Sequence, residues 1–213
     1  MRRWLSGLAV LALAAARAAA QMPDAPPTTF GVTVVDPFGM RGDIYLLEPG
    51  TDQLPKFEKL EPIGSVWANS LNIVPRNFRD GFPGITDRFE WFAIDYQGFF
   101  YVDKPGKYKF GIASDDGAKL YIDGKEAIDN DGIHPTRTAY RELSLKGGIH
   151  RIRVSYFQGP ADQLCLILGI RRPNEEWRIF STEEFRPPRN PADWKYGNPD
   201  DLPKDPRPPV NRK

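Results

Sequence analysis

Lys107-Tyr108-Lys109-Phe110-Gly111-Ile112 alternates polar or small residues with apolar ones. Successive side chains of a β-strand point to opposite faces, so the three apolar residues of this stretch would share one buried face. The segment 151–156 alternates in the same way. Both segments are therefore predicted to be half-buried strands, which contribute Tyr108, Phe110, Ile112, Ile152, Val154 and Tyr156 to a core.

Turn signals divide the surrounding sequence into short segments. Leu120 and Ile122 form another strand pattern that runs into Asp123-Gly124, a dipeptide that favours a type I′ hairpin turn. Pro105-Gly106 and Gly147-Gly148 mark two more turns. Further strands are expected over 29–35, 89–96 and 98–102, and a capping-box pattern predicts one short helical turn over 181–184. Many short strands with regular turns predict an all-β fold, an antiparallel sandwich or barrel.

The two ends of the chain differ in composition from this body. Arg2 and Arg3 precede an apolar run, and Ala18, Ala19 and Ala20 supply a small-residue cleavage pattern. This order predicts a signal peptide over residues 1–20 and a mature protein that starts at Gln21. A retained membrane anchor is the less favoured alternative, because Arg17 interrupts the apolar run. The expected location is secreted or periplasmic, with no transmembrane segment after cleavage.

The remaining residues divide into three parts. Residues 21–28 are a Pro-rich extended lead-in, and 29–186 form a single domain. Residues 187–213 are rich in proline and charge, so they are predicted to be a flexible or extended tail that adds little stability. Trp194 and Tyr196 are the residues that can dock this tail onto the domain.

Composition and motifs exclude several function classes. The net charge of +1 and the sequence pI of about 7.8 leave no basic stripe for nucleic acid. The single cysteine, Cys165, makes no intrachain disulfide and lies in an apolar run that predicts a buried, inert thiol. His134 and His150 lack metal-ligand spacing, and no nucleophile elbow, metalloprotease helix or phosphate loop is present. The chain is therefore predicted not to be an enzyme.

Two short motifs suggest binding sites that their context does not support. Asp129-Asn130-Asp131-Gly132 resembles part of an EF-hand loop, but Ala127 and Thr138 stand where acidic ligands belong. A solvated acidic turn is the better interpretation. Arg41-Gly42-Asp43 is an integrin-type tripeptide, and here it is interpreted as a chance occurrence between strands.

The stretch 91–170 resembles the protective-antigen (PA14) domain family, with its segments in the same order. The most specific segment is Ser114-Asp115-Asp116-Gly117-Ala118-Lys119-Leu120-Tyr121-Ile122-Asp123-Gly124, and the others are 98–110, 129–134 and 145–157. The resemblance implies an antiparallel β-sandwich. Members of this family occur in adhesins, toxins, glycosidases and cell-surface proteins, and several bind sugars.

The resemblance also implies a binding site. In the yeast-adhesin branch, two consecutive aspartates joined by a cis peptide hold a calcium ion that binds sugar hydroxyls, and they correspond to Asp115 and Asp116. An asparagine ligand of the adhesins corresponds to Gln158, a departure that would shift or remove this ligand, and Asp162 is a possible replacement. The expected metal ligands are Asp115, Asp116 and Gln158, and the sugar site adds Asp162. The alternative is that Ser114–Gly117 forms a plain turn.

Two functions from different classes follow. The first is a secreted, non-catalytic, lectin-like module that binds a glycan or cell-surface polysaccharide with the help of calcium. The second is an envelope module that holds a protein partner without binding sugar, with the Pro-rich tail as a docking segment. An unrecognised hydrolase is the least favoured hypothesis.

Overall fold

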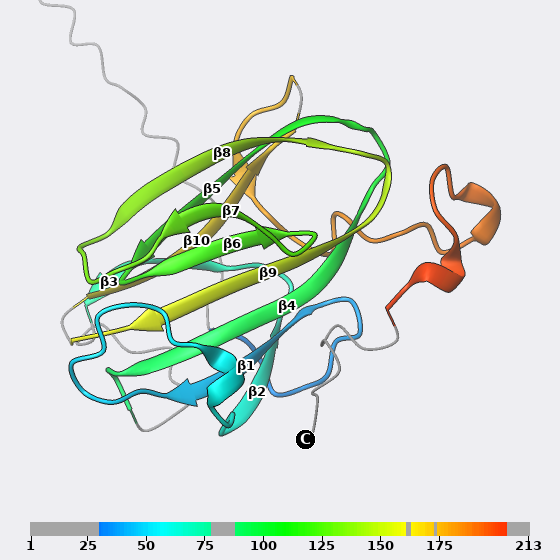
Figure 1. Cartoon of the computed structure of the whole chain (residues 1–213). Coiled ribbons are helices and arrows are strands. Elements are labelled where there is room, and N and C mark those ends of the chain that lie inside the picture. Colours follow the sequence, from blue (N-terminus) through cyan, green and yellow to red (C-terminus); the bar gives the residue numbers. More distant parts are fainter. Residues whose placement is uncertain (1–29, 78–87, 161–162, 173, 204–213) are drawn as a thin grey trace, which may run out of the picture.

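Two antiparallel sheets pack face to face in the computed structural model (Figure 1), which describes residues 30–77, 88–160, 163–172 and 174–203. The first sheet has the order β2-β1-β4-β9-β6-β7, with strands Gly64–Ala68, Met40–Leu46, Phe92–Val102, Gly148–Gln158, Ala118–Ile122 and Lys125–Asn130. The second has the order β11-β10-β5-β8, with strands Arg178–Ile179, Gln163–Arg171, Gly106–Asp115 and Arg137–Leu145, and β3 (Asn72–Asn77) also pairs with β10. Short 3-10 turns occur at Phe57–Lys59 (η1), Pro191–Asp193 (η3) and Pro199–Asp201 (η4). The predicted β-sandwich is confirmed.

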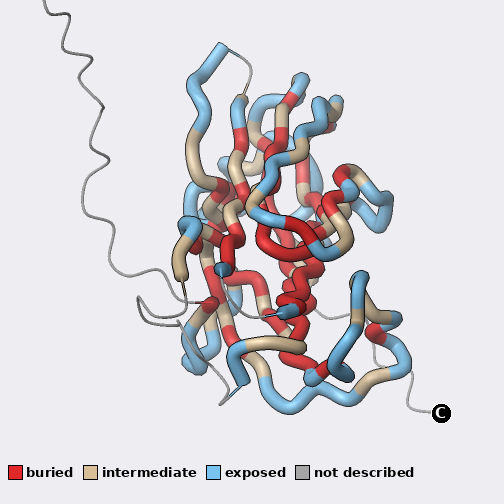
Figure 2. The backbone as a smooth tube through the Cα atoms, turned by 90° about the vertical axis from the view of Figure 1, so that its left-hand side faces the viewer, coloured by how far each residue is buried: buried red, intermediate tan, exposed pale blue. Residues whose placement is uncertain are grey.

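The core lies between the two sheets, where the apolar faces of the strands meet (Figure 2). Each core residue predicted from alternation is buried, from Phe110 at 0% to Ile122 at 6% exposed. Phe30, Phe92 and Tyr156 form an aromatic group within this core, with ring centroids 5.6–6.2 Å apart. The period-two pattern therefore gives the correct register for β5, β6 and β9.

Three local expectations differ from the structure. Residues 30–35 form no strand and only one bridge, Val32 to Trp67, because Val34 and Val35 face solvent and have no partner strand. The two segments on either side of Gln97 are one continuous strand, β4, since Gly98 fits into the ladder opposite Ile152. Residues 182–185 form a turn and no helix, because Phe185 is drawn into the core and two prolines follow it.

The hairpin between β6 and β7 has the predicted turn. Asp123 and Gly124 have φ angles of 52° and 76°, as a type I′ turn requires. The Asp123 carboxylate also lies 2.7 Å from His150 Nδ1 and accepts a hydrogen bond from the Arg151 amide at 2.9 Å. The turn is thereby held against β9.

The segment after Pro187 docks on the domain as far as the structure describes it. The Trp194 ring packs on Tyr101 with centroids 5.1 Å apart, and its Nε1 donates to the Pro188 carbonyl at 2.8 Å. The Tyr101 hydroxyl accepts from the Lys195 and Tyr196 amides at 3.2 and 3.1 Å. The docking through Trp194 and Tyr196 that the sequence left open is therefore present.

Several sequence predictions fall where the structure gives no information. The predicted signal peptide, the lead-in and residues 204–213 lie outside the described residues. The described part of the chain contains no helix with the length and apolar character of a membrane span.

Candidate functional site

Asp115 and Asp116 lie where the chain passes from one sheet to the other. Asp115 ends β5, a cis peptide bond joins it to Asp116, and β6 begins at Ala118 in the opposite sheet. Gly117 is required in this short link, because a Cβ there would come within 2.3 Å of the Phe157 ring. The Phe157 amide donates to the Gly117 carbonyl at 2.9 Å and so fixes the link against the end of β9.

Asp116 connects two loops through its carboxylate. Its Oδ1 accepts from the His134 amide at 3.1 Å, and its Oδ2 accepts from the Gly159 amide at 2.8 Å. These backbone donors carry no side-chain signal, so the sequence did not identify them. The side chain is 4% exposed, and its position is fixed by the β7–β8 loop and the loop after β9.

Asp115 is held less completely than Asp116. Its Oδ2 accepts from the Thr136 hydroxyl at 3.3 Å, and a hydrogen bond from the Thr136 backbone also stabilises the ionised carboxylate. The Asp115 backbone carbonyl lies 2.8 Å from the Tyr156 hydroxyl of the facing sheet. Among the described residues, the hydrogen bonds to the Asp115 carboxylate therefore come from one residue, Thr136.

The electrostatics of the pair are unusual for a plain turn. Burial raises the pKa of both carboxyl groups, and the neighbouring charge of Asp116 raises the pKa of Asp115 further. No lysine or arginine among the described residues forms an ion pair with either one, although the backbone amides on Asp116 favour its ionised form. Two adjacent buried carboxylates without a counter-ion favour the binding of a cation.

Gln158 does not present its oxygen to this pair. Its Nε2 lies near three acceptors, Asp116 Oδ2 at 3.3 Å and the carbonyls of Pro160 and Gln163 at 3.3 and 3.1 Å. Its Oε1 lies 2.6 Å from the Tyr156 hydroxyl. The residue is fully buried, and three acceptors around one atom identify that atom as the amide nitrogen. In this arrangement Gln158 donates a hydrogen bond to Asp116, and its expected role as a metal ligand stays a prediction.

No third acidic, histidine or cysteine ligand is found at the pair among the described residues. Asp162 lies outside the described residues. Within the described ranges, no three His, Cys, Asp or Glu side chains gather closely enough to hold a metal ion. A cation at Asp115 and Asp116 would therefore need backbone oxygens, water or ligand hydroxyls to complete its coordination.

The remaining motifs have structural roles. Asn130 is buried and donates to Ser114 Oγ at 2.8 Å, while Asp129 pairs with Lys119 at 2.8 Å. Arg41 and Asp43 pair with each other at 2.8 Å within β1, so this tripeptide is not a free loop. The predicted buried thiol of Cys165 is confirmed, and burial raises its pKa to about 12.

Comparison with known proteins identifies a domain family and solved structures that resemble this fold. The PA14 domain model matches residues 79–178. The PA14 domain of the MpAFP antifreeze protein is 17% identical, with a TM-score of 0.58 over 76% of this chain and 94% of that one. A structure described as the PA14 sugar-binding domain from an RTX adhesin is 19% identical, with a TM-score of 0.55 over 68% of this chain and 96% of that one.

A larger protein contains the same fold. An anti-sigma factor domain-containing protein is 18% identical with a TM-score of 0.56, and the match covers 72% of this chain. The chain spans about half of that protein, 48% of its length. No curated protein is similar enough in sequence to count as a match. The two-sheet sandwich and the match over residues 79–178 together show that this chain contains a PA14 domain.

Proposed function

We propose that this chain is a non-catalytic carbohydrate-binding module in which Asp115 and Asp116 hold a calcium ion that contacts the sugar. One observation carries the proposal: two adjacent buried carboxylates form no ion pair with a lysine or arginine among the described residues, and the hydrogen bonds to the Asp115 carboxylate come from Thr136 alone. The sugar-binding description of the RTX adhesin domain, which shares the fold, supports the same class of ligand. Export of the module is part of the proposal and rests on the N-terminal sequence.

The donor set fits a hard divalent cation. Calcium takes six to eight oxygen ligands with flexible geometry, and carboxylates are its usual protein ligands. Asp115 and Asp116 would hold the ion, with Gln158, Gly159 and His134 fixing Asp116 in place through hydrogen bonds. When bound, calcium supplies open positions that the hydroxyl oxygens of a sugar can fill.

The residues around the pair have separate tasks in this proposal. The amides of His134 and Gly159 orient the Asp116 carboxylate and reduce the repulsion between the two acidic side chains. Thr136 holds the Asp115 carboxylate through its hydroxyl and its backbone. Asp162 stays in the proposed ligand set as a prediction from the sequence.

A calcium titration of the melting temperature tests the metal site. Extracellular calcium modules have dissociation constants of about 10⁻⁴ to 10⁻³ M, so about 10 mM calcium would stabilise the folded state by up to roughly 2.7 kcal/mol. For a domain of this size, that gain corresponds to a rise in melting temperature of roughly 5–10 °C. Asp115→Asn should abolish the rise, whereas Asp52→Asn, a change at an exposed position, should keep it.

Sugar binding is measured separately on a glycan array with and without chelator. Binding that disappears with chelator and with Asp115→Asn supports the full proposal. Glycan binding that persists in chelator would reject the role of calcium and keep the carbohydrate function. A melting curve that calcium leaves unmoved, together with an empty array, would reject both.

A further inference from the structure

Two large aromatic side chains lie exposed on the outer face of the second sheet. Tyr140 of β8 is 57% exposed, and Trp177, just before β11, is 39% exposed. Their ring centroids are 5.3 Å apart with an angle of 57° between the planes. Neighbouring exposed aromatic rings on a sheet face form a surface that commonly marks a binding site.

A glycine is needed where the Tyr140 ring lies against the sheet, and a second glycine lies beneath the Trp177 ring. Gly111 of β5 pairs with Tyr140 on one side and with Gly169 of β10 on the other. A Cβ at Gly111 would come within 2.8 Å of the Tyr140 ring, and one at Gly169 would lie 3.6 Å from the Trp177 ring. We call Tyr140, Trp177 and these two glycines the aromatic platform.

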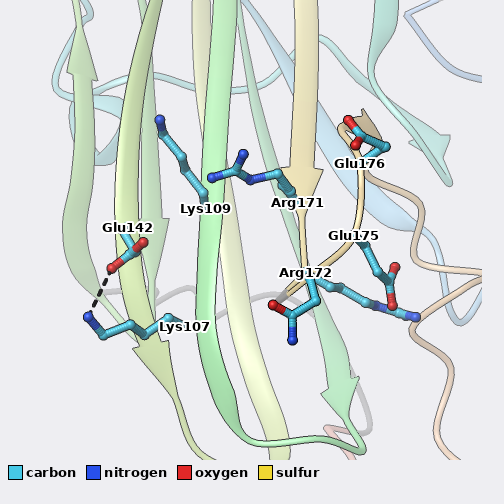
Figure 3. A pocket seen from close by; sticks show the side chains of 8 residues that line it. Lys107, Lys109, Glu142, Arg171, Arg172, Glu175 and Glu176 are labelled. Atoms are coloured by element: carbon cyan, nitrogen blue, oxygen red, sulfur yellow. Dashed lines mark ion pairs between the residues drawn. The ribbon is translucent and has the colours of Figure 1, made fainter.

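Cations that lack a carboxylate partner border the aromatic platform. Lys109 Nζ lies 5.2 Å from the Tyr140 ring centroid and 5.8 Å from that of Trp177, and the Arg171 guanidinium lies 5.8 Å from the Trp177 centroid. Neither cation forms an ion pair with any described residue, whereas Lys107 pairs with Glu142 at 3.3 Å. Figure 3 shows the Arg171 side chain extending toward the neighbouring strand that carries Lys109, whose own side chain extends away from Arg171.

The same cations line an open hollow beside the aromatic platform. The hollow has a volume of about 550 Å³, and its walls also carry Glu142, Glu175 and Glu176. It therefore presents two unpaired cations together with several hydrogen-bond acceptors. A ligand that carries both hydroxyl groups and a carboxylate would match this mixture.

We propose that the aromatic platform and its hollow bind a carboxylate-bearing sugar unit of an acidic polysaccharide. The apolar face of the sugar ring would pack on Tyr140 and Trp177, and its carboxylate would meet Lys109 and Arg171. The glutamates of the hollow would accept hydrogen bonds from hydroxyl groups. This site is separate from the aspartate pair, because Asp115 lies four residues from Gly111 along β5, about 13 Å away.

The charges of the hollow argue against a nucleic acid. Single-stranded nucleic acids also use aromatic rings and cations, but they need a positive groove that follows a chain with one charge per nucleotide. Here three glutamates nearly balance the four basic residues that line the hollow, and the whole chain has a net charge of only +1. A sparsely charged glycan suits this balance better.

Calorimetry with three probes in chelator tests the proposal without any contribution from calcium. The probes are an oligogalacturonate, a neutral dextran oligosaccharide and an oligo-dT strand of similar length. We expect binding of the oligogalacturonate alone, with quenching of Trp177 fluorescence. Tyr140→Ala with Trp177→Ala should weaken it at least tenfold, and Lys109→Gln with Arg171→Gln should weaken it and reduce its salt dependence.

Three further variants make the outcome specific. Two of them are matched controls that should leave the affinity unchanged. Tyr121→Ala removes an aromatic ring that lies beneath Arg153 on the other sheet, and Lys125→Gln changes an exposed residue of β7. Asp115→Asn should also leave it unchanged, which separates this site from the calcium proposal. The proposal is overturned by absent oligogalacturonate binding at millimolar concentration, by equal or tighter binding of oligo-dT, or by unchanged binding in the folded lysine–arginine double variant.

Discussion

Asp116 uses both of its carboxylate oxygens to hold backbone amides of two loops, whereas the hydrogen bonds to the Asp115 carboxylate among the described residues come from Thr136 alone. The two residues therefore have different roles although they are adjacent and chemically identical. Replacing Asp116 would break both of these hydrogen bonds, so a substitution there is more apt to disturb the fold. Asp115 is the position at which charge can be removed with the smallest loss of internal contacts.

Asp115→Asn should change stability in opposite directions with and without calcium. Because burial and Asp116 raise the pKa of Asp115 above its unfolded value, the folded state binds this proton more tightly. The stability that protonation contributes is present at low pH and is lost as the pH rises through the raised pKa. In chelator at neutral pH, the asparagine variant should therefore melt above the wild type, and the difference should shrink as the pH falls.

In about 10 mM calcium the order should reverse, because only the wild type would gain from the ion. Melting curves between pH 4 and 8 in both solutions give this comparison. A variant that melts below the wild type at every pH in chelator would show that Asp115 already has a favourable partner in the metal-free protein.

The sequence pointed to the aspartate pair but not to the way in which Gln158 contacts it. The pair was found through its local motif, Ser114–Gly117, which is a property of neighbouring residues. The orientation of the Gln158 amide depends on Tyr156, Pro160 and Gln163, which are near in sequence, and on Asp116, which is 42 residues away. The conformation of this loop and the approach of Asp116 leave no trace in the spacing of residues.

At the scale of elements, β4 has contacts on each side that explain its length. It pairs with β1 and β9 in the sheet, and its last residues meet the segment after Pro187. Alternation predicted β5 and β9 because each has one apolar and one polar face. The predicted strand over 29–35 is wrong for residues 30–35, since apolar residues in sequence need a partner strand to form a ladder.

Leu120→Ala in β6 should cost about 2–5 kcal/mol, because the fully buried side chain would leave a cavity between the sheets. The adjacent Lys119→Ala is the matched control on the outward side of the same strand, and the loss of its surface ion pairs should cost about 1 kcal/mol or less. Chemical denaturation of both variants measures the difference. Equal losses for the two variants would contradict the register of β6.

Tyr101→Phe should loosen the segment after Pro187 while leaving the sandwich folded. The hydroxyl of Tyr101 accepts hydrogen bonds from the amides of Lys195 and Tyr196. Its removal should therefore weaken the docking of the segment on the domain by about 1–3 kcal/mol of free energy. Hydrogen exchange at these two amides should become faster, with β9 unchanged. Protection that stays at the wild-type level would show that Trp194 holds the segment alone.

At the scale of the whole molecule, the C-terminal segment completes the domain surface as far as Pro203. The proline-rich and charged composition of this segment predicts that it has no core of its own. Its docking depends on Tyr101 and on Gly147, where a Cβ would come within 2.2 Å of the Tyr196 ring. Those partners lie far away in sequence, so composition does not reveal the docking. With the docking in view, we expect the segment to add stability to the domain.

A truncation that ends at Arg186 should lower the unfolding free energy by about 2 kcal/mol, because it exposes Tyr101 and removes the partly buried Trp194. For a domain of this size the melting temperature should fall by roughly 4–8 °C. A truncation that ends at Pro203 should melt within about 1 °C of the full chain, since these contacts are kept. An unchanged melting temperature for the shorter form would contradict the docking.

The short link between β5 and β6 has a mechanical consequence. Asp115 ends a strand of the second sheet, and Ala118 starts a strand of the first sheet. Asp116 accepts hydrogen bonds from Gly159, just after β9 of the first sheet, and from His134, in the loop that joins the two sheets. The candidate site is therefore a clasp between the two layers. A ligand bound there would resist the sliding of one sheet over the other. The force needed to unfold the domain would therefore rise with the occupancy of the site.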